Sequence, residues 1–478
     1  MALKHSEEIL DQWKSRQSLA EKMIPLMGAL YRDKGVAIKV FGRRLMNATT
    51  IDILKAHRVG RRMIGEELDI EATFALVEAM DKMDLAPARV DIGMLAIAYA
   101  KLGGSQSVEN FLQAELAPVL GQSADQAPKD VVLYGFGRIG RLLARLLIER
   151  TGSGSNMRLR AVVVRGKGGD LEKRASLLRR DSIHGPFNGT ITVDEERNAI
   201  IANGTYIQVI YANGPDQVDY TEYGIQNALV VDNTGIWKDR DGLGLHLKSK
   251  GATKVLLTAP AKGDIKNIVA GINSHDVEES DTILCAASCT TNAIVPVLKA
   301  VNDKFGIKNG HIETVHSYTN DQNLVDNMHS AERRGRSAPM NMVITSTGAA
   351  KAVAKALPEL GGKLTGNAIR VPTPNVSMAV MNLNLDTATD KEELNNFLRE
   401  RALGEMQGQV GFTLSTELVS TDLVGSEDAG VVDGAATIVD GDRVVLYVWY
   451  DNEAGYSNQV VRVMQKVVGL QMPEFPSA

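Results

Sequence analysis

The sequence contains only 2 cysteines in 478 residues, Cys285 and Cys289. Cysteines four positions apart, at an expected strand end and helix start, cannot supply the disulfide framework of a small secreted protein. No apolar run approaches the about 18 residues that cross a bilayer. The first eight residues also lack the apolar core of a signal peptide. We therefore expect a cytoplasmic protein with no membrane association.

The chain also lacks a strong excess of charge of either sign, because its formal net charge is only −5. This balance argues against a general nucleic-acid or membrane-surface binder. Apolar residues make up 44% of the chain and charged residues 23%, as in ordinary globular proteins. We find no internal repeat of fixed period and expect no metal site. The length predicts two or three domains.

Residues 1–124 carry apolar side chains at helical spacing and predict an all-α N-terminal extension. We expect helices over 7–27, 70–83, 90–102 and 108–120. Six basic residues within this extension favour a solvated helix face over a phosphate site: Arg43, Arg44, Lys55, Arg58, Arg61 and Arg62. The small, polar stretch 121–129 predicts a linker.

Short apolar runs then alternate with helical patterns, which predicts an α/β domain. A strand over 131–134 is followed by Gly135, Gly137 and Gly140 in a G-x-G-x-x-G pattern, and a helix is expected over 141–149. Glycines at these positions permit a tight turn and the approach of a pyrophosphate to a helix N-terminus. The strand–turn–helix setting favours dinucleotide binding over a simple turn.

The next expected strand, 159–164, runs into Arg165-Gly166 rather than into a carboxylate. An acidic residue at this point selects NAD, whereas a basic one accepts the 2′-phosphate of NADP. We therefore expect NADP or both cofactors. The alternative is that Asp170 turns back to bind the ribose.

Cys289 lies between an apolar run over 282–285 and a helical pattern over 293–305. A helix N-terminus favours a thiolate, and the neighbouring hydroxyls of Ser288 and Thr290 can bind anions. Cys289 is therefore a candidate nucleophile, although an isolated cysteine is more often a small buried residue.

Longer strands after Cys289, over 310–318, 367–371, 377–385 and 443–450, predict a second domain with a mixed or antiparallel sheet. His316 on the first of these is a candidate general base, or a structural histidine. Arginines in the segments 333–336 and 369–372 can bind phosphate, or form surface ion pairs.

Five segments in this order resemble phosphorylating glyceraldehyde-3-phosphate dehydrogenase, over about 129–468. They are Gly135-Phe136-Gly137-Arg138-Ile139-Gly140-Arg141, Ser288-Cys289-Thr290-Thr291-Asn292, Thr345-Ser346-Thr347-Gly348-Ala349-Ala350-Lys351, Arg370-Val371-Pro372-Thr373-Pro374-Asn375-Val376-Ser377 and Trp449-Tyr450-Asp451-Asn452-Glu453.

The resemblance implies a Rossmann-type NAD(P)-binding domain over 125–288, a catalytic domain over 289–451 and a C-terminal helix, 452–470, that returns to the first. It implies Cys289 as nucleophile and His316 as base. The implied phosphate sites, for substrate and for inorganic phosphate, draw on Ser288, Thr290, Thr319, Asp321, Arg336, Thr347, Gly348 and Arg370. Further implied cofactor contacts, besides the glycines and Arg165, are Arg138, Ile139, Thr234, Thr258, Asn452 and Tyr456.

The resemblance further implies a homotetramer in which the loop 330–342 reaches a neighbouring subunit's cofactor site. Two departures stand out. Arg165-Gly166 replaces the family's usual Asn-Asp, and Ala293 replaces a second cysteine that many members carry. The N-terminal extension has no counterpart in the ordinary enzyme, so this chain resembles a long form in which the extension binds an unknown partner or serves assembly or regulation.

The sequence thus predicts reversible oxidation of glyceraldehyde 3-phosphate, with inorganic phosphate and NAD(P), to 1,3-bisphosphoglycerate through a cysteine thioester. An erythrose-4-phosphate dehydrogenase is the nearest alternative. A non-catalytic binding or regulatory relative is the alternative of another class.

Overall fold

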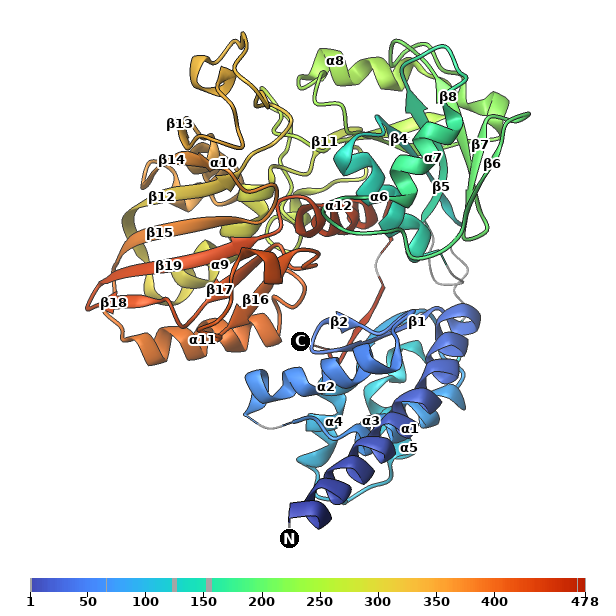
Figure 1. The fold of residues 1–478 in the computed structure, drawn as a ribbon, viewed down its shortest axis with the longest axis vertical. Helices are drawn as coiled ribbons and strands as arrows, with labels where there is room; N and C mark the ends of the chain where they lie inside the picture. Colours follow the sequence, from blue (N-terminus) through green and yellow to red (C-terminus); the bar gives the residue numbers. More distant parts are fainter. Residues whose placement is uncertain (1, 66, 123–126, 152–156, 471, 478) are drawn as a thin grey trace.

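Within the residues that it describes, this computed structural model is organised around three β-sheets (Figure 1). The described residues are 2–65, 67–122, 127–151, 157–470 and 472–477. Each sheet is packed with helices around its own hydrophobic cluster. The sequence predicts the second and third sheets, and the first is additional.

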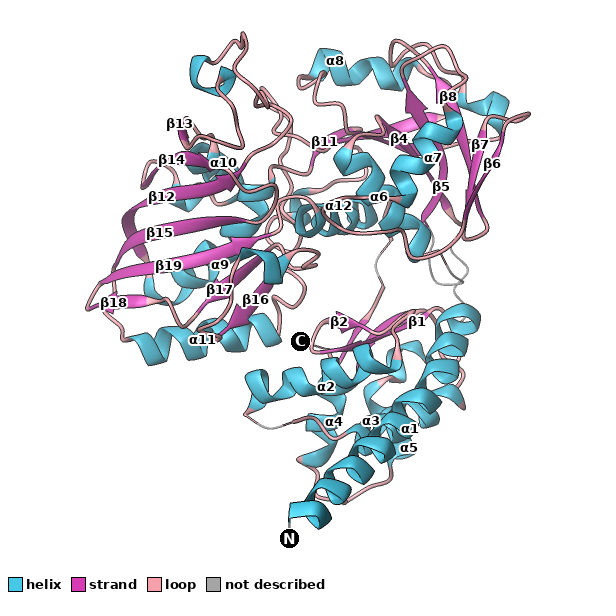
Figure 2. Ribbon diagram, viewed as in Figure 1, coloured by secondary structure: helices cyan, strands magenta, loops and turns pink. Residues whose placement is uncertain are grey.

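The N-terminal region packs its helices on a small four-stranded sheet of order β2-β1-β3-β20 (Figure 2). Its helices are α1 (Ala2–Lys34), α2 (Thr50–Ile64), α3 (Ile70–Asp81), α4 (Ile92–Ala100) and α5 (Val108–Glu115), followed by the 3₁₀ turn η1 (Ala117–Val119). Its strands are β1 (Val36–Val40), β2 (Arg43–Arg44), β3 (Ala88–Asp91) and β20 (Glu474–Phe475).

The helices of the extension are therefore confirmed, but the expectation of an all-α region left out this sheet. The central strand β1 is buried along its whole length. Its apolar residues continue the helical pattern of α1 in the sequence, so periodicity alone does not separate them from a helix. β3 also pairs in parallel with β20, more than 380 residues away, which no local signal reveals.

The second sheet is eight-stranded, of order β11-β10-β9-β4-β5-β8-β7-β6, and parallel from β11 to β8. Its strands are β4 (Lys129–Tyr134), β5 (Met157–Val164), β6 (Ile191–Asp194), β7 (Ala199–Ala202), β8 (Thr205–Tyr211), β9 (Ala228–Asp232), β10 (Ala252–Leu257) and β11 (Ile283–Cys285). Helices α6 (Arg138–Glu149) and α7 (Leu171–Arg179) contribute to the cluster on one face, and α8 (Arg240–Gly244), with the 3₁₀ turns η2 (Tyr220–Tyr223) and η3 (Leu245–Lys248), covers the other. This is the predicted Rossmann-type arrangement.

The third sheet is mixed, of order β13-β14-β12-β15-β19-β17-β16 with β18 beside β19. Its strands are β12 (Ile307–Ser317), β13 (Val343–Thr345), β14 (Leu364–Val371), β15 (Ser377–Leu385), β16 (Val410–Thr413), β17 (Gly430–Asp433), β18 (Ile438–Asp440) and β19 (Arg443–Tyr450). Helices α9 (Cys289–Phe305), α10 (Ala349–Ala356) and α11 (Lys391–Leu403) pack on one face and share its core. The predicted mixed sheet is confirmed.

Helix α12 (Ala454–Val467) follows the third sheet but buries Val460, Val463 and Met464 in the core of the second sheet, beside α6 (Figure 1). The chain then passes to β20 in the N-terminal sheet. One C-terminal segment thus links all three regions. The boundaries at 124/125 and 288/289 stay a prediction; residues 123–126 of the expected linker lie outside the described residues.

Candidate active site

Cys289 is the first residue of α9, directly after the turn that leaves β11. Ser288 is the N-cap: its Oγ accepts from the backbone N–H of Thr291 at 3.1 Å and bonds to the Thr291 hydroxyl at 2.7 Å. A hydroxyl in this role satisfies one of the free N–H groups of the first turn. The predicted helix start is confirmed, and it fixes the Cys289 side chain at the end of the helix.

The turn before Cys289 is held in an unusual conformation. Ala287 has φ of +55°, a region that residues with a Cβ rarely adopt. The Tyr456 hydroxyl donates to the Ala287 carbonyl at 3.0 Å. The Asn292 amide donates to the carbonyls of Ala286 and Ser288, both at 2.9 Å. These side chains hold the strained turn, which is how such strain persists at a site.

His316, near the end of β12, faces the thiol. Its Nε2 lies 3.6 Å from Cys289 Sγ, and its Nδ1 lies 2.7 Å from the carbonyl oxygen of Ser317. Nδ1 also lies 3.0 Å from Arg370 Nη1. In the tautomer whose Nδ1–H donates to the Ser317 carbonyl, the Nε2 lone pair is directed at the thiol. The parallel register places Arg370 of β14 beside His316, and Arg370 Nη1 donates to the Ser317 carbonyl at 3.0 Å.

Burial disfavours the charged form of both side chains. Burial and then the Arg370 charge lower the pKa of His316 to about 3. Burial raises the pKa of the Cys289 thiol, while Arg370 and hydrogen bonds from Thr290 act in the opposite direction. Burial thus opposes the thiolate that the helix N-terminus favours. The arrangement suits a thiol that gives up its proton to His316 as it attacks.

The residues expected at phosphate sites are distributed unevenly around this pair. Arg370 lies beside it, and Thr319 follows β12. Thr347 and Gly348 stand at the start of α10, where the Thr347 methyl group packs near Gly366 of β14. The buried Thr290 hydroxyl is already bonded to the Tyr450 hydroxyl at 3.0 Å.

Two of the expected phosphate residues are paired with other side chains. Asp321 is exposed and forms an ion pair with Arg334. Arg336 pairs with Asp326 at 2.7 Å and is exposed. Arg334, rather than Arg336, contributes positive charge at His316 and Arg370, since it lowers the pKa of both. The sequence predicts phosphate binding for the arginines of the whole segment 333–336, and the resemblance singles out Arg336 rather than Arg334.

The glycine turn between β4 and α6 fits a dinucleotide pyrophosphate. Gly135 has φ of +95°, and a Cβ on Gly140 would stand 2.2 Å from the Gly135 carbonyl oxygen, so neither position accepts a side chain. Gly137 caps α6 without a side chain and leaves the first N–H groups of the helix open to an anion. The Arg138 side chain pairs with Glu453 and Asp181, so its contribution here is its backbone N–H.

Other expected cofactor residues lie at the carboxyl ends of neighbouring strands, where open α/β sheets bind ligands. Thr234 follows β9, and its N–H and hydroxyl both donate to Asp232 at 2.7 Å. The Thr258 hydroxyl, after β10, donates to Asn233 Oδ1 at 3.0 Å. Asn452 is buried and its Oδ1 accepts from the Ser377 hydroxyl at 3.0 Å, which orients its amide group.

Comparisons with known proteins agree with this geometry. Residues 129–240 match the model of the glyceraldehyde 3-phosphate dehydrogenase NAD binding domain, and residues 288–452 match that of the C-terminal domain. The chain belongs to the glyceraldehyde 3-phosphate dehydrogenase family. It therefore carries a nicotinamide dinucleotide-binding domain and is an oxidoreductase of this type.

Two relatives show how much of the chain the family covers. A glyceraldehyde-3-phosphate dehydrogenase-like protein of Pseudomonas aeruginosa is 61% identical over 95% of this chain and 100% of its own length. Glyceraldehyde-3-phosphate dehydrogenase 2 of Trichormus variabilis is 42% identical over 70% of this chain and 98% of its own length. The alignment with the first relative includes the N-terminal extension, so this chain is a long form within the family.

The loop after β5 has Arg165 and glycines at the positions where an acidic residue would bind the cofactor ribose. Arg165 is exposed, and Gly166, Gly168 and Gly169 all have positive φ. Asp170 accepts from the Tyr211 hydroxyl at 2.8 Å and from Arg174 at 2.9 Å. Its carboxylate is thus occupied within the protein, which argues against the alternative that Asp170 binds the ribose.

A buried cluster between the sheets was missed in the sequence. His184 Nε2 lies 3.0 Å from Asp451 Oδ2 and 3.2 Å from the Asn375 amide, and its Nδ1 lies 3.3 Å from Arg138. It joins the glycine turn, the third sheet and the start of α12. These residues are so distant in the chain that no spacing points to the cluster.

The described residues contain no group of three or more His, Cys, Asp or Glu side chains able to hold a metal ion. Among the same residues, no helix has both the length and the hydropathy for a membrane span.

Proposed function

We propose that this dehydrogenase catalyses the reversible, phosphate-dependent oxidation of glyceraldehyde 3-phosphate to 1,3-bisphosphoglycerate. The observation that carries the proposal is the 3.6 Å approach of Cys289 Sγ to His316 Nε2, with Arg370 beside both. A nucleophile, a base within reach and a neighbouring cation are what covalent aldehyde oxidation requires.

Cys289 Sγ adds to the aldehyde carbon, and its thiol proton passes by way of His316 Nε2 to the carbonyl oxygen, which leaves His316 neutral again. The resulting hemithioacetal loses its hydroxyl proton to His316 as it becomes a thioester. The bound nicotinamide supplies the acceptor for the hydride that leaves the same carbon. Attack by inorganic phosphate then breaks the carbon–sulfur bond, releases the acyl phosphate and returns the thiol. Arg370, Thr319 and Asp321 are proposed for the substrate phosphate, and Ser288, Thr290, Thr347, Gly348 and Arg336 for the attacking phosphate.

The decisive experiment compares kcat/KM for glyceraldehyde 3-phosphate and erythrose 4-phosphate, each with and without inorganic phosphate. We expect the first aldehyde with phosphate to be the best pair. A higher kcat/KM for erythrose 4-phosphate would replace the proposed substrate. Absence of cofactor reduction with either aldehyde would contradict enzymatic function and favour a binding or regulatory role.

For the cofactor, we propose NADP, or both nicotinamide dinucleotides. Exposed Arg165 and Lys167 provide positive charge in the loop after β5, where an acidic residue would select NAD. We expect Arg165→Ala to raise KM for NADP about tenfold and KM for NAD much less, since one charged hydrogen bond is worth about 1.5–3 kcal/mol. Arg160→Ala, on β5 but paired with Asp130, is the matched control. Equal effects of Arg165→Ala on both cofactors would contradict the assignment.

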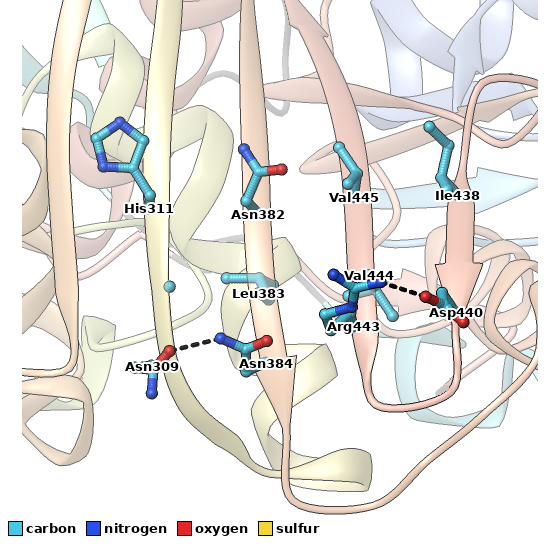
Figure 3. A pocket seen from close by; sticks show the side chains of 11 residues that line it. Asn309, His311, Asn382, Leu383, Asn384, Ile438, Asp440, Arg443, Val444 and Val445 are labelled. Atoms are coloured by element: carbon cyan, nitrogen blue, oxygen red, sulfur yellow. Dashed lines mark hydrogen bonds and ion pairs between the residues drawn. The ribbon is translucent and has the colours of Figure 1, made fainter.

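We also propose that copies of the chain associate, as expected for a tetramer. The face of the third sheet opposite α9 carries a groove lined by His311, Asn382 and Val445, with exposed Ile438 beside them (Figure 3). The segment after β12 also exposes several large apolar side chains, which mark interaction surfaces: Leu324, Val325, Met328, Met340 and Met342. Ile438→Lys should lower the mass of the enzyme in light scattering, and an unchanged mass would exclude this face as an interface.

A further inference from the structure

Helix α12 has two faces with different partners. Its apolar face packs in the core of the second sheet, beside α6 (Figure 1). Its other face carries polar side chains at every third position, Gln459, Arg462 and Gln465. These side chains bond to the third-sheet region and to the N-terminal extension. The proposed reaction does not involve this polar face.

Two of the polar residues bind backbone carbonyls of the third-sheet region. The buried Gln459 amide donates to the Gly408 carbonyl at 2.9 Å and to the Glu427 carbonyl at 3.2 Å. Arg462 Nη1 donates to the Gln407 carbonyl at 3.1 Å. Loss of such bonds leaves buried polar groups unpaired, which is costly. Helix α12 is therefore tied to the turn that follows α11.

The extension binds the same turn from the other side. The buried Asp91, which is the N-cap of α4, accepts from the Gln407 side-chain amide at 2.8 Å. Its carboxylate also accepts, at 2.7–3.1 Å, from the backbone N–H groups of Phe41, Gly42, Gly93 and Met94. A Cβ on Gly42 would stand 3.1 Å from Gln407 Cγ, so the backbone of the extension closely approaches this side chain. One glutamine thus connects a buried carboxylate of the extension with Arg462.

A second connection joins the extension to the end of α12. Arg89 of β3 donates to Gln465 Oε1 at 2.7 Å and to Glu474 of β20 at 2.6 Å. The buried Lys39 of β1 lies 3.6 Å from the same Glu474 carboxylate. Although burial acts in the opposite direction, the charges of Lys39 and Arg89 lower the pKa of Glu474 to about 2. The extension therefore holds α12 at two places.

The start of α12 supports the turn before Cys289. The Tyr456 hydroxyl donates to the Ala287 carbonyl at 3.0 Å, where backbone φ is +55°. Tyr456 and Arg462 are six residues apart on one helix, which is about 9 Å along its axis. Because a packed helix is a rigid element, a displacement at Arg462 is carried to Tyr456. A strained turn persists only while its surroundings hold it.

We propose that the N-terminal extension positions α12, and through Tyr456 the turn that presents Cys289. The positioning residues are Asp91, Gln407 and Arg462, which act through the helix and not on the reacting atoms. The proposal rests on the proposed function, since it concerns the same nucleophile. Release of the extension from α12 lowers the reactivity of Cys289 without unfolding either region.

The test is the rate at which iodoacetamide alkylates Cys289, measured by peptide mass spectrometry on the full-length protein. Gln407→Met removes the amide that donates to Asp91 and keeps the length of the side chain. We expect an alkylation rate about two- to fivefold lower, a change that corresponds to one hydrogen bond. Gln17→Met is the matched control, because Gln17 bonds to Glu21 within α1, and it should leave the rate unchanged. Circular dichroism reports that each variant is folded.

Alkylation requires neither aldehyde nor cofactor, so its outcome is separate from that of the proposed reaction. An unchanged rate in Gln407→Met would overturn the positioning role even if the enzyme oxidises glyceraldehyde 3-phosphate. Equal slowing in Gln17→Met would also overturn it, because general destabilisation would explain both. Arg89→Met, which breaks the second connection, should lower the rate in the same direction and provides the test if Gln407→Met does not fold.

A double variant tests whether the effect passes through Tyr456. Tyr456→Phe releases the Ala287 turn directly and should itself slow alkylation. Addition of Gln407→Met to this variant should then cause no further loss, so the two effects are not additive. Fully additive effects would show that the extension does not act through this helix and turn, and would overturn the proposal.

Discussion

Two cysteines four residues apart occupy opposite ends of the same turn and have different surroundings. Cys285, at the end of β11, is fully buried; its thiol lies 2.9 Å from the carbonyl oxygen of Ala259, to which it donates. Burial raises the pKa of Cys285 to about 11. Cys289, at the start of α9, is partly exposed and faces His316 and Arg370.

The comparison indicates that the two thiols differ because of the residues that face them. The residues next to each cysteine in the sequence do not account for the difference. Cys285 accepts a hydrogen bond from the backbone N–H of Ala287 at 3.2 Å, so its sulfur supports the turn. Cys289 projects from the same turn toward a base and a cation on β12 and β14. One thiol supports the turn, and the other is the proposed nucleophile.

The largest expected effect separates the two thiols directly. Cys289→Ser should lower kcat/KM on the order of 10³- to 10⁶-fold, as expected for loss of a covalent nucleophile. Cys285→Ala should retain activity within a few-fold and lower the free energy of unfolding by about 1–2 kcal/mol, because it removes buried sulfur contacts. Steady-state rates and denaturant unfolding measure both. Comparable activity losses would remove the proposed division of roles.

The next effect concerns the base that distinguishes Cys289. His316→Asn should lower kcat about 10²- to 10⁴-fold, since general-base assistance is lost while the site keeps its size. Because the pKa of His316 is lowered to about 3, its neutral form is present throughout pH 5–9. The wild-type acid limb should therefore not show a histidine titrating near 6.5. A pH–rate profile of kcat/KM checks this, and a limb near 6.5 that vanishes in His316→Asn would contradict it.

Removal of the Arg370 charge should have a smaller effect, a further rise in the pKa of Cys289. Positive charge on Arg370 favours the thiolate, so Arg370→Met should raise the pKa of Cys289 further. At pH 7.5 the thiolate fraction, and with it the rate of alkylation by iodoacetamide, should fall about tenfold per unit of added shift. Arg333→Met is the control, because Arg333 is exposed on the neighbouring loop and donates to the Ile344 carbonyl. An unchanged alkylation rate in Arg370→Met would show that the charge does not reach the sulfur.

Local patterns predicted the elements around Cys289 well. The apolar run 282–285 became β11, and the small residues before 293 became the first turn of α9, which begins at Cys289 itself. His316 and Arg370 were identified only by type and by resemblance. They lie close together because β12 pairs in parallel with β14, which places His316 beside Arg370. The two residues are 54 positions apart, and this spacing does not predict the contact.

Other features of the molecule depend still more on distant contacts. The N-terminal sheet needs β20 from the opposite end of the chain, and His184 needs Asp451 and Asn375. The pKa of the Cys289 thiol also depends on distant contacts. The helix dipole follows from the local sequence, whereas desolvation depends on the residues that cover the site. Burial, strand partners and long-range ion pairs are properties of the assembled fold.

The smallest expected effect tests whether the turn itself must be held for Cys289 to work. Tyr456→Phe removes only the hydroxyl that donates to the Ala287 carbonyl, where backbone φ is +55°. Relaxation of this turn would move Cys289 relative to His316, so kcat should fall about fivefold, which corresponds to about 1 kcal/mol, the net value of one hydrogen bond. The rate of Cys289 alkylation should fall in parallel. Tyr450→Phe, which removes the bond to Thr290 behind the same cysteine, serves as the matched comparison. If kcat falls in Tyr450→Phe but not in Tyr456→Phe, the thiol is positioned from the side of β19 rather than through the strained turn from α12.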